Sequence, residues 1–249
     1  MGKSEELVLF WHRAGNDAEG LNAVLSQTTR LHGRTLRHAV ECDLKWDLEG
    51  REPLLFFHHG LTGLSRPRRS KVEARGWLTL DQLLARPRAD ELDYMFEMKG
   101  GRGSSREAVT RLVRAMEDRG LGHRFVIAAS SLPLLRDLRR DNEALLLGLF
   151  VVHTRIDGLV VNVPFIDLPR SVSAAGTLRP VDLGGIDVVV GSGPLGRGES
   201  VWRPAMEGLT LIPGPIGGVE GVERLAREGS QSGFIYFNAR TPLIGSPFG

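Results

Sequence analysis

The sequence predicts an α/β protein with a (β/α)8 barrel of the TIM type, in a single domain that spans residues 1–249. Three observations favour this fold. The length of 249 residues matches the usual size of such a barrel, which is about 250 residues. Short apolar runs alternate with amphipathic stretches, as they do in βα units that build a parallel sheet. Polar side chains follow several apolar runs, at the strand ends where these barrels carry their active sites.

Short apolar runs predict the strands. Strands are expected at residues 7–11, 37–43, 53–58, 92–98, 125–129, 145–150, 209–212 and 233–237. Residues 151–205 are rich in Gly and Pro and carry two weaker strand signals, at 158–163 and 186–190. We assign no role to this segment.

Amphipathic stretches between the strands predict the helices. Asp17 and Thr79 stand at the starts of two of them, where a side-chain oxygen accepts hydrogen bonds from free backbone N–H groups. Residues 65–76 are expected to form an arginine-rich loop, and 100–105 a glycine-rich turn before a helix that Gly120 closes. Helices are expected at 17–29, 80–86, after Ser105 to about 119, 131–140 and 218–228.

Composition excludes several classes of protein and of site. The formal net charge of +2 is too small for a strong positive field, so we expect no nucleic-acid partner. The one cysteine, Cys42, excludes a disulfide within the chain and a multi-cysteine zinc site. No stretch approaches the roughly 18 apolar residues of a membrane span, and the N-terminal residues lack signal-peptide features. We expect a cytoplasmic protein without stable membrane insertion, and the sequence leaves the oligomeric state open.

Four polar clusters follow predicted strands. They are His12 with Arg13, Glu41 with Asp43, His58 with His59, and Glu97 with Lys99. Side chains alternate in direction along a strand, so the members of an i, i+2 pair point to the same face. Glu41 therefore points the same way as Asp43, and Glu97 the same way as Lys99. We expect these clusters to converge at one end of the sheet.

Three converging carboxylates predict a metal site. Glu41, Asp43 and Glu97 would repel one another unless a cation lay between them. Hard oxygen ligands of this kind favour Mg²⁺ or Ca²⁺ over zinc.

The order of these motifs resembles that of the glycerophosphodiester phosphodiesterase family. The similar elements are an HR-G motif, an E-x-D motif, a histidine after a strand that begins with Pro, and an E-x-K motif. The resemblance extends to TLDQLL at 79–84, to FVIAASSLPLLRDLRRDNEALLLGL at 125–149 and to GFIYFNARTP near the C-terminus. The chain departs from the family pattern at Ala14, which separates His-Arg from Gly, and at His59, where the family has Asp.

The resemblance implies a TIM barrel that hydrolyses glycerophosphodiesters, or related phospholipid headgroup esters, with a divalent metal. By this resemblance the acid–base pair is His12 with His58, or with His59 if the register differs by one residue. The metal ligands are Glu41, Asp43 and Glu97, and Arg13 and Lys99 bind the phosphate. The partner is a small-molecule phosphodiester.

Two alternatives stay open. One is phospholipase-D-like action on a lysophospholipid or sphingolipid. The other is a catalytically silent barrel that binds a phosphorylated ligand. The sequence does not distinguish among phosphodiesters or between the two metals.

Overall fold

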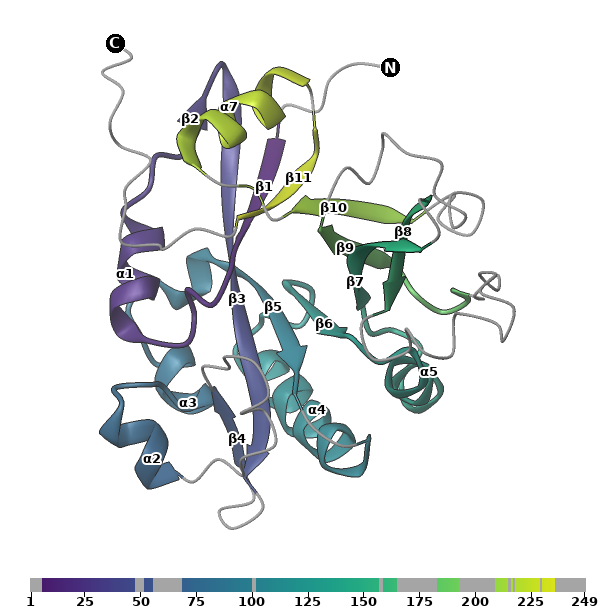
Figure 1. Ribbon diagram of the computed structural model, residues 1–249. Coiled ribbons are helices and arrows are strands. Elements are labelled where there is room, and N and C mark those ends of the chain that lie inside the picture. The colour runs from purple at the N-terminus through teal and green to yellow at the C-terminus, as the bar shows by residue number, and fades with distance from the viewer. Residues whose placement is uncertain are drawn as a thin grey trace. The chain divides into compact units, whose positions relative to one another are not determined.

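A computed structural model describes most of the chain, and its elements are labelled in Figure 1. The described residues are 6–47, 52–55, 69–99, 102–156, 159–164, 183–192, 209–214, 216, 218–228 and 230–235. The chain divides into two compact units, of which the first combines residues 1–125 with 216–249 and the second comprises residues 126–215. Every predicted site residue that the structure describes belongs to the first unit.

Four described strands of the first unit run parallel to one another. β3 (Arg34–Asp47) lies between β1 (Glu6–Trp11) and β5 (Asp93–Met98), and β11 (Ser232–Ile235) pairs with the other side of β1. All six residues of β5 are buried, as expected for a parallel strand that is covered on both faces. Because the strands are parallel, the residues that follow β1, β3 and β5 meet at one edge of this sheet.

A short hairpin precedes the body of β3. β2 (Arg30–Leu31) pairs antiparallel with the start of β3. The two turn residues, His32 and Gly33, have φ angles of 49° and 75°. This left-handed pair matches the twist of a two-residue hairpin turn. This strand was not predicted from the sequence.

A second hairpin corrects the predicted third strand. The apolar run at 53–58 was expected to be a parallel barrel strand, but β4 (Glu52–Leu55) is antiparallel to β3. Leu55 lies opposite Leu44 in this ladder. Only four residues separate the two strands, whereas a parallel crossover needs about a dozen.

Helices connect the strands of the first unit. Their bounds are α1 (Ala18–Leu25), α2 (Arg69–Ala74), α3 (Leu80–Leu84), the 3-10 helix η2 (Ala89–Glu91), α4 (Arg102–Glu117) and α7 (Gly218–Glu228). Both predicted N-caps are confirmed. Asp17 Oδ1 accepts the Gly20 N–H at 2.7 Å, and Thr79 forms a reciprocal capping box with Gln82.

Two helix predictions need correction. α2 lies within the segment that was expected to be a loop, where its exposed Arg69 pairs with Glu73 one turn later at 2.8 Å. α4 begins at Arg102, inside the predicted glycine-rich turn. Its predicted end is confirmed, because Gly120 has a φ of 71°, a conformation that favours glycine.

The second unit also contains four described parallel strands. Their order is β6 (Phe125–Ala129), β7 (Leu147–Ile156), β9 (Val188–Ser192) and β10 (Thr210–Gly214), and α5 (Leu132–Asp141) follows β6. The two weaker signals are both strands, but they differ in direction. β8 (Leu159–Pro164) is antiparallel to β7, whereas β9 is parallel to it. The described part of the chain therefore contains eight strands in parallel ladders, four in each unit.

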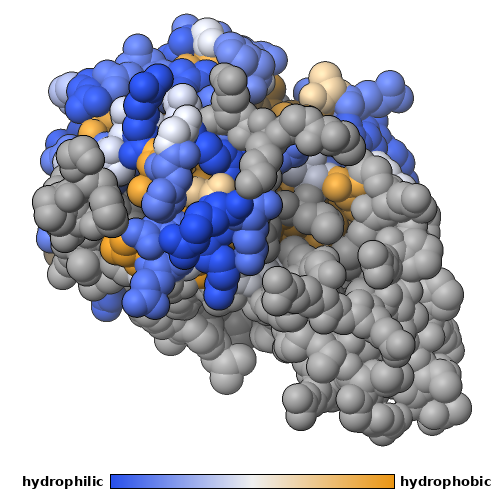
Figure 2. Space-filling model, turned by 90° about the horizontal axis from the view of Figure 1, so that it is seen from above, coloured by the Kyte–Doolittle hydropathy of each residue, from blue (hydrophilic) through white to orange (hydrophobic). Residues whose placement is uncertain are grey.

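Buried side chains are mainly apolar in both units. Trp11, Tyr94 and Phe96 are the largest that are fully buried, and the rings of Tyr94 and Phe96 stack with their centroids 5.5 Å apart. On the face shown in Figure 2, the described side chains are mostly hydrophilic, with small apolar patches between them. Among the described residues, no helix has the length and apolar character needed to cross a membrane.

Candidate active site

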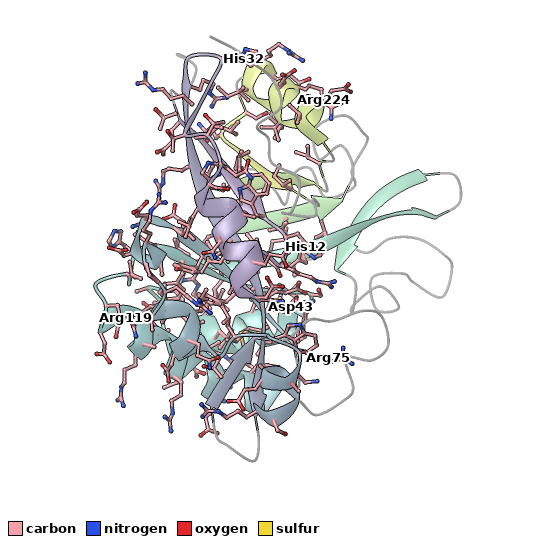
Figure 3. The ribbon with its side chains drawn as sticks, turned by 90° about the vertical axis from the view of Figure 1, so that its left-hand side faces the viewer. His12, His32, Asp43, Arg75, Arg119 and Arg224 are labelled. Atoms are coloured by element: carbon pink, nitrogen blue, oxygen red, sulfur yellow. The ribbon has the colours of Figure 1, made fainter. Side chains whose placement is uncertain are left out.

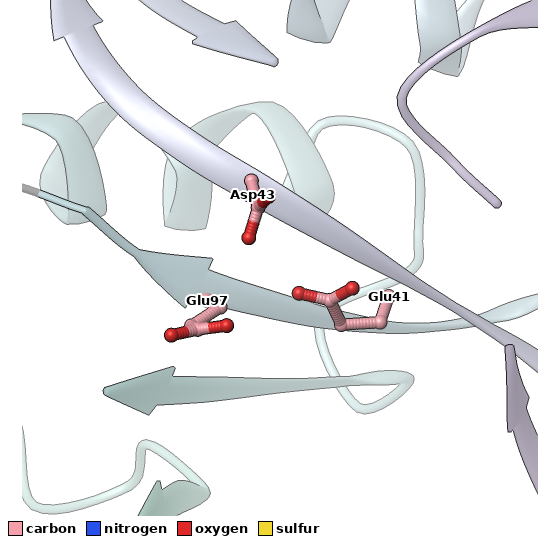
Figure 4. Close-up of side chains that lie close together, drawn as sticks. All are labelled: Glu41, Asp43 and Glu97. Atoms are coloured by element: carbon pink, nitrogen blue, oxygen red, sulfur yellow. The ribbon is translucent and has the colours of Figure 1, made fainter. Parts of the chain in front are cut away.

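Three acidic side chains converge near the carboxyl ends of β3 and β5. Asp43 and Glu97 are partners in the ladder between the two strands, and Glu41 lies two residues before Asp43 on the same face. Figure 4 shows the three carboxylates close together on these strands. One carboxylate oxygen from each residue lies within 4.8 Å of those from the others, and all three residues are buried. The structure thus brings the three predicted metal ligands together.

Two cations lie against these acids. Arg13 Nε is 3.0 Å from Asp43 Oδ2, and Lys99 Nζ is 3.2 Å from Asp43 Oδ1. The same ammonium lies 2.5 Å from Glu97 Oε1. Asp43 therefore contacts a different cation through each of its oxygens. Both predicted phosphate-binding residues lie at the site, where they neutralise carboxylates.

The electrostatics of Glu41 differ from those of an exposed glutamate. Burial is the largest cause of a pKa raised well above its usual range, and the charges of Asp43 and Glu97 raise it further. Lys99 and the Arg13 N–H oppose this shift. Burial likewise raises the pKa of Glu97, against the lowering effect of Lys99. Both carboxyl groups therefore hold a proton more readily than an exposed glutamate does.

Lys99 stays charged in this environment. Burial lowers its pKa, but the charges of Glu97 and Asp43 outweigh burial, and the pKa of Lys99 is raised. An ammonium held in this way offers a fixed positive charge at the carboxyl end of β5.

The donor set fits a hard divalent cation. Glu41 Oε1 is buried and has no hydrogen-bond partner among the residues that the structure describes. A buried carboxylate oxygen without a partner is costly, and coordination to a cation removes that cost. Three carboxylates within 4.8 Å of one another supply the oxygen ligands that Mg²⁺ and Ca²⁺ prefer.

His12 follows β1 directly and lies beside the acids. Its Nε2 is 4.0 Å from Glu41 Oε2, and its side chain is 14% exposed. Figure 3 shows His12 near Asp43 in the first unit. The predicted catalytic histidine thus has both a carboxylate neighbour and access to solvent.

Arg13 contacts the acids through its backbone as well as through its side chain. Its N–H donates to Glu41 Oε2 at 2.7 Å. The residue has a φ of 58°, the left-handed region that residues other than glycine seldom occupy. Such a conformation costs about 1–3 kcal/mol and persists where surrounding contacts require it. The backbone N–H of Arg13 thus contacts Glu41, while its guanidinium contacts Asp43.

His58 and His59 lie outside the described residues. The structure therefore leaves their assignment as a prediction. The described strand nearest to them in sequence, β4, ends at Leu55.

Two residues that shape the site, Gly15 and Asn16, were not predicted from the sequence. The Gly15 N–H donates to the Glu41 carbonyl at 3.3 Å, and a Cβ added at Gly15 would lie 2.1 Å from Cys42 Sγ. Asn16 is fully buried, and its Oδ1 accepts the Asp43 N–H at 3.1 Å. No local pattern signals either contact, because both join residues about 27 positions apart. The available hint was the departure of the His12–Asn16 loop from the family motif.

Comparison with known proteins relates this fold to phosphodiesterases. No protein family model matches the sequence, and no curated protein is significantly similar to it. A glycerophosphodiester phosphodiesterase from Parabacteroides distasonis aligns with a TM-score of 0.56 and 12% identity, over 94% of each chain. One from Agrobacterium tumefaciens aligns with a TM-score of 0.54 and 14% identity, over 93% of this chain and 95% of its own.

A third solved structure contains a reaction product. This Oleispira antarctica phosphodiesterase, in complex with the product sn-glycerol-3-phosphate, aligns with a TM-score of 0.54 and 11% identity, over 93% of this chain and 94% of its own. At these identities the likeness concerns the fold. It confirms the predicted fold class, an α/β protein of the (β/α)8 barrel type, and supports the resemblance drawn from the motifs at the level of the fold.

Proposed function

We propose that this protein is a metal-dependent phosphodiester hydrolase that acts on glycerophosphodiesters or related phospholipid headgroup esters. The observation that carries the proposal is the cluster of Glu41, Asp43 and Glu97 with two cations near the end of the parallel ladder between β3 and β5. The solved phosphodiesterases of the same fold add independent support. The whole chain acts as one catalytic domain in this proposal, because those structures align over more than nine tenths of it.

Charge balance supports a metal-first order of binding. With all groups ionised, three carboxylates against Arg13 and Lys99 leave one negative charge, which repels a phosphodiester. A divalent cation held by the carboxylates changes this to one positive charge, which matches the single negative charge of a phosphodiester. When bound, the metal stabilises the charge that builds on the phosphoryl oxygens. Arg13 and Lys99 then bind and orient the phosphate through their remaining N–H groups.

The reaction needs two proton carriers. A water oxygen forms a bond to phosphorus, and the bond from phosphorus to the alcohol oxygen of the headgroup breaks. One histidine accepts a proton from the water, and the other donates a proton to the departing alcohol. In-line displacement requires the entering and leaving oxygens to lie on opposite sides, so the histidines must flank the phosphate. We propose His12 for one side and His58 or His59 for the other.

The β3–β4 hairpin supports a histidine from the following segment. Leu55 pairs with Leu44, the residue next to Asp43. His58 lies three positions after Leu55, and three extended residues span at most about 11 Å. A tether of this length from the neighbourhood of Asp43 permits His58 to reach the acids, and His59 lies one residue further.

The product of the Oleispira enzyme suggests which bond is cleaved. That structure contains sn-glycerol-3-phosphate as the product. We propose the same product here, so that hydrolysis releases the headgroup alcohol and leaves the phosphate on glycerol. We also propose that the enzyme works in the cytoplasm on small-molecule substrates.

A panel of phosphodiesters tests this proposal. The protein is stripped of metal with a chelator and assayed with glycerophosphocholine, glycerophosphoethanolamine, lysophosphatidylcholine and sphingomyelin, with Mg²⁺, Ca²⁺ or no metal. We expect release of sn-glycerol-3-phosphate from the first two substrates, only with metal, and loss of activity in Glu41→Gln.

Other outcomes would replace the proposal. Preference for lysophosphatidylcholine or sphingomyelin would indicate the phospholipase-D-like alternative. If the protein hydrolyses none of the four substrates, with or without metal, but binds glycerol phosphate saturably, the result would indicate the catalytically silent barrel.

A further inference from the structure

Asn16 lies beside the part of β3 that pairs with neither β1 nor β4. β1 pairs with β3 as far as Trp11 opposite Val40, and the chain then turns away. β4 pairs with β3 only from Leu44 onward. Between these points lie the two metal-ligand positions of β3, so their backbone groups need partners from elsewhere.

The loop after β1 supplies these partners. The Gly15 N–H donates to the carbonyl of Glu41 at 3.3 Å, and the side-chain Oδ1 of Asn16 accepts the N–H of Asp43 at 3.1 Å. A neighbouring parallel strand would make the same two hydrogen bonds, one with the Glu41 carbonyl and one with the Asp43 N–H, which flank Cys42. A side-chain amide thus continues the ladder beyond the end of β1.

The backbone of Asn16 is fixed on both of its sides. Its N–H donates to the Arg13 carbonyl at 3.2 Å, and its carbonyl accepts the Leu78 N–H at 2.9 Å. The residue has no exposed surface. An anchored, buried amide defines a single position for the acceptor oxygen, and with it the position of the Asp43 backbone.

We infer that Asn16 is a positioning residue, which holds Asp43 so that its carboxylate faces Glu41 and Glu97 in the metal site. The inference rests on the proposed function and deepens it. Asn16 acts through the backbone of Asp43, because its acceptor oxygen bonds the N–H of that residue and not its carboxylate. Outer partners that orient a metal ligand typically contribute about 10- to 100-fold to metal affinity.

Metal affinity of three variants tests the role. Asn16→Leu has nearly the same shape but no acceptor, whereas Asn16→Asp keeps an acceptor oxygen at the same place. Asp17→Ala is the matched control, because it removes the neighbouring N-cap bond to Gly20 and leaves the bond to Asp43 intact. The dissociation constants of Mg²⁺ and Ca²⁺ are measured by calorimetric titration of the metal-free full-length protein, beside its thermal unfolding midpoint.

The two roles give different results. We expect Asn16→Leu to raise the dissociation constant about 10- to 100-fold. Asn16→Asp should bind metal at least as tightly as the unchanged protein. Asp17→Ala should lower the unfolding midpoint without weakening metal binding. Equal loss of affinity in Asn16→Leu and Asp17→Ala would mean that the loop has only a structural role, and it would overturn the inference.

The test also covers a variant that does not fold and a protein that binds no metal. If Asn16→Leu does not fold, Asn16→Ser takes its place, because the shorter hydroxyl cannot reach the Asp43 N–H. If the unchanged protein binds metal and the Leu or Ser variant binds it equally tightly, this inference is overturned and the proposed function is not. If the unchanged protein binds neither metal, the proposed function fails and the inference fails with it.

Discussion

Asp43 on β3 and Glu97 on β5 lie opposite each other in a parallel ladder, and the ammonium of Lys99 contacts both carboxylates. A single cation therefore joins the two strands at the site. It lies near Glu41, whose raised pKa reflects burial and then the charges of the other two acids. In the proposed function, the stability of the metal-free protein and metal binding therefore depend on the same three carboxylates.

Lys99→Met should destabilise the metal-free protein more than the metal-bound one. Removing one partner of a buried ion pair costs about 3–5 kcal/mol, and partial exposure of Lys99 reduces this to about 1–3 kcal/mol. A divalent cation replaces part of the missing charge, so the loss should shrink at saturating Mg²⁺ or Ca²⁺. Urea unfolding with and without metal measures the difference.

Lys45→Met is the control for that experiment. Lys45 lies on β3, and burial lowers its pKa, but it is not one of the cations that contact the three acids. Its replacement should change stability equally with and without metal. If Lys99→Met also loses the same stability with and without metal, the ammonium and the metal do not stabilise the same carboxylates.

His12→Ala and His58→Ala should each lower kcat by about 10²- to 10⁴-fold, the usual contribution of a general acid or base. The double variant should lose less than the product of the two effects, because groups that act as a unit are not additive. Steady-state kinetics with glycerophosphocholine and saturating metal measures both.

His59→Ala decides the register of the second histidine. A large loss in His59→Ala with a mild loss in His58→Ala would assign the role to His59. If neither change matters in an active preparation, the two-histidine mechanism is wrong.

His38 should make stability depend on pH. Its Nδ1 accepts the Trp11 indole N–H at 3.1 Å, so Nε2 carries the proton and donates to the Thr28 carbonyl at 2.9 Å. Burial lowers the pKa of His38 below the ordinary value of 6.5, partly opposed by the Thr28 carbonyl. The folded protein then binds a proton less readily than the unfolded chain, so this contribution is full above pH 6.5 and falls as the pH drops below it.

His38→Gln isolates that contribution. A glutamine amide offers one acceptor and one donor group but does not titrate. Between pH 7.5 and 5.5, the free energy of unfolding should fall more steeply in the unchanged protein than in His38→Gln. Identical slopes would show that His38 does not contribute.

Arg34→Met should destabilise the first unit by about 2–3 kcal/mol, because it leaves buried and partly buried carbonyl groups without this donor. The buried guanidinium donates to the carbonyls of Glu6 and Ser230 at 2.7 and 2.6 Å and to that of Ala226 at 3.3 Å. It thus joins the start of β1 to the end of α7. Chemical denaturation measures the loss.

The matched control for Arg34 is Arg37→Met on the same strand. The Arg37 side chain is 45% exposed and pairs with carboxylates. Exposed pairs are worth about 0.2–1 kcal/mol, so the control should lose less. A loss as large as that of Arg34→Met would contradict the importance of the buried carbonyl contacts.

The convergence of the three proposed metal ligands was predictable from the sequence because their geometry is local. The i, i+2 spacing of Glu41 and Asp43 fixes a common face once residues 37–43 form a strand. The third acid, Glu97, follows because the carboxyl ends of parallel strands meet at one edge. These inferences need only the alternation of a strand and the direction of a sheet.

The predicted direction of the strand at 53–58 was wrong, and the spacing in the sequence already gave the physical reason. Nine residues separate it from the strand predicted at 37–43, too few for a crossover helix. The contact of Asn16 with Asp43 was not predictable, since it depends on where β1 ends relative to β3. That register arises only when the sheet is assembled.

The close approach of Gly15 to Cys42 constrains how this sequence can evolve. A Cβ at position 15 would lie 2.1 Å from Cys42 Sγ, so an alanine there requires the Cys42 thiol to move or a smaller residue at position 42. We therefore expect a change of Gly15 to be tolerated best where position 42 is already glycine or alanine. The two positions are epistatic, and among homologous sequences a side chain at the first should co-occur with a small residue at the second.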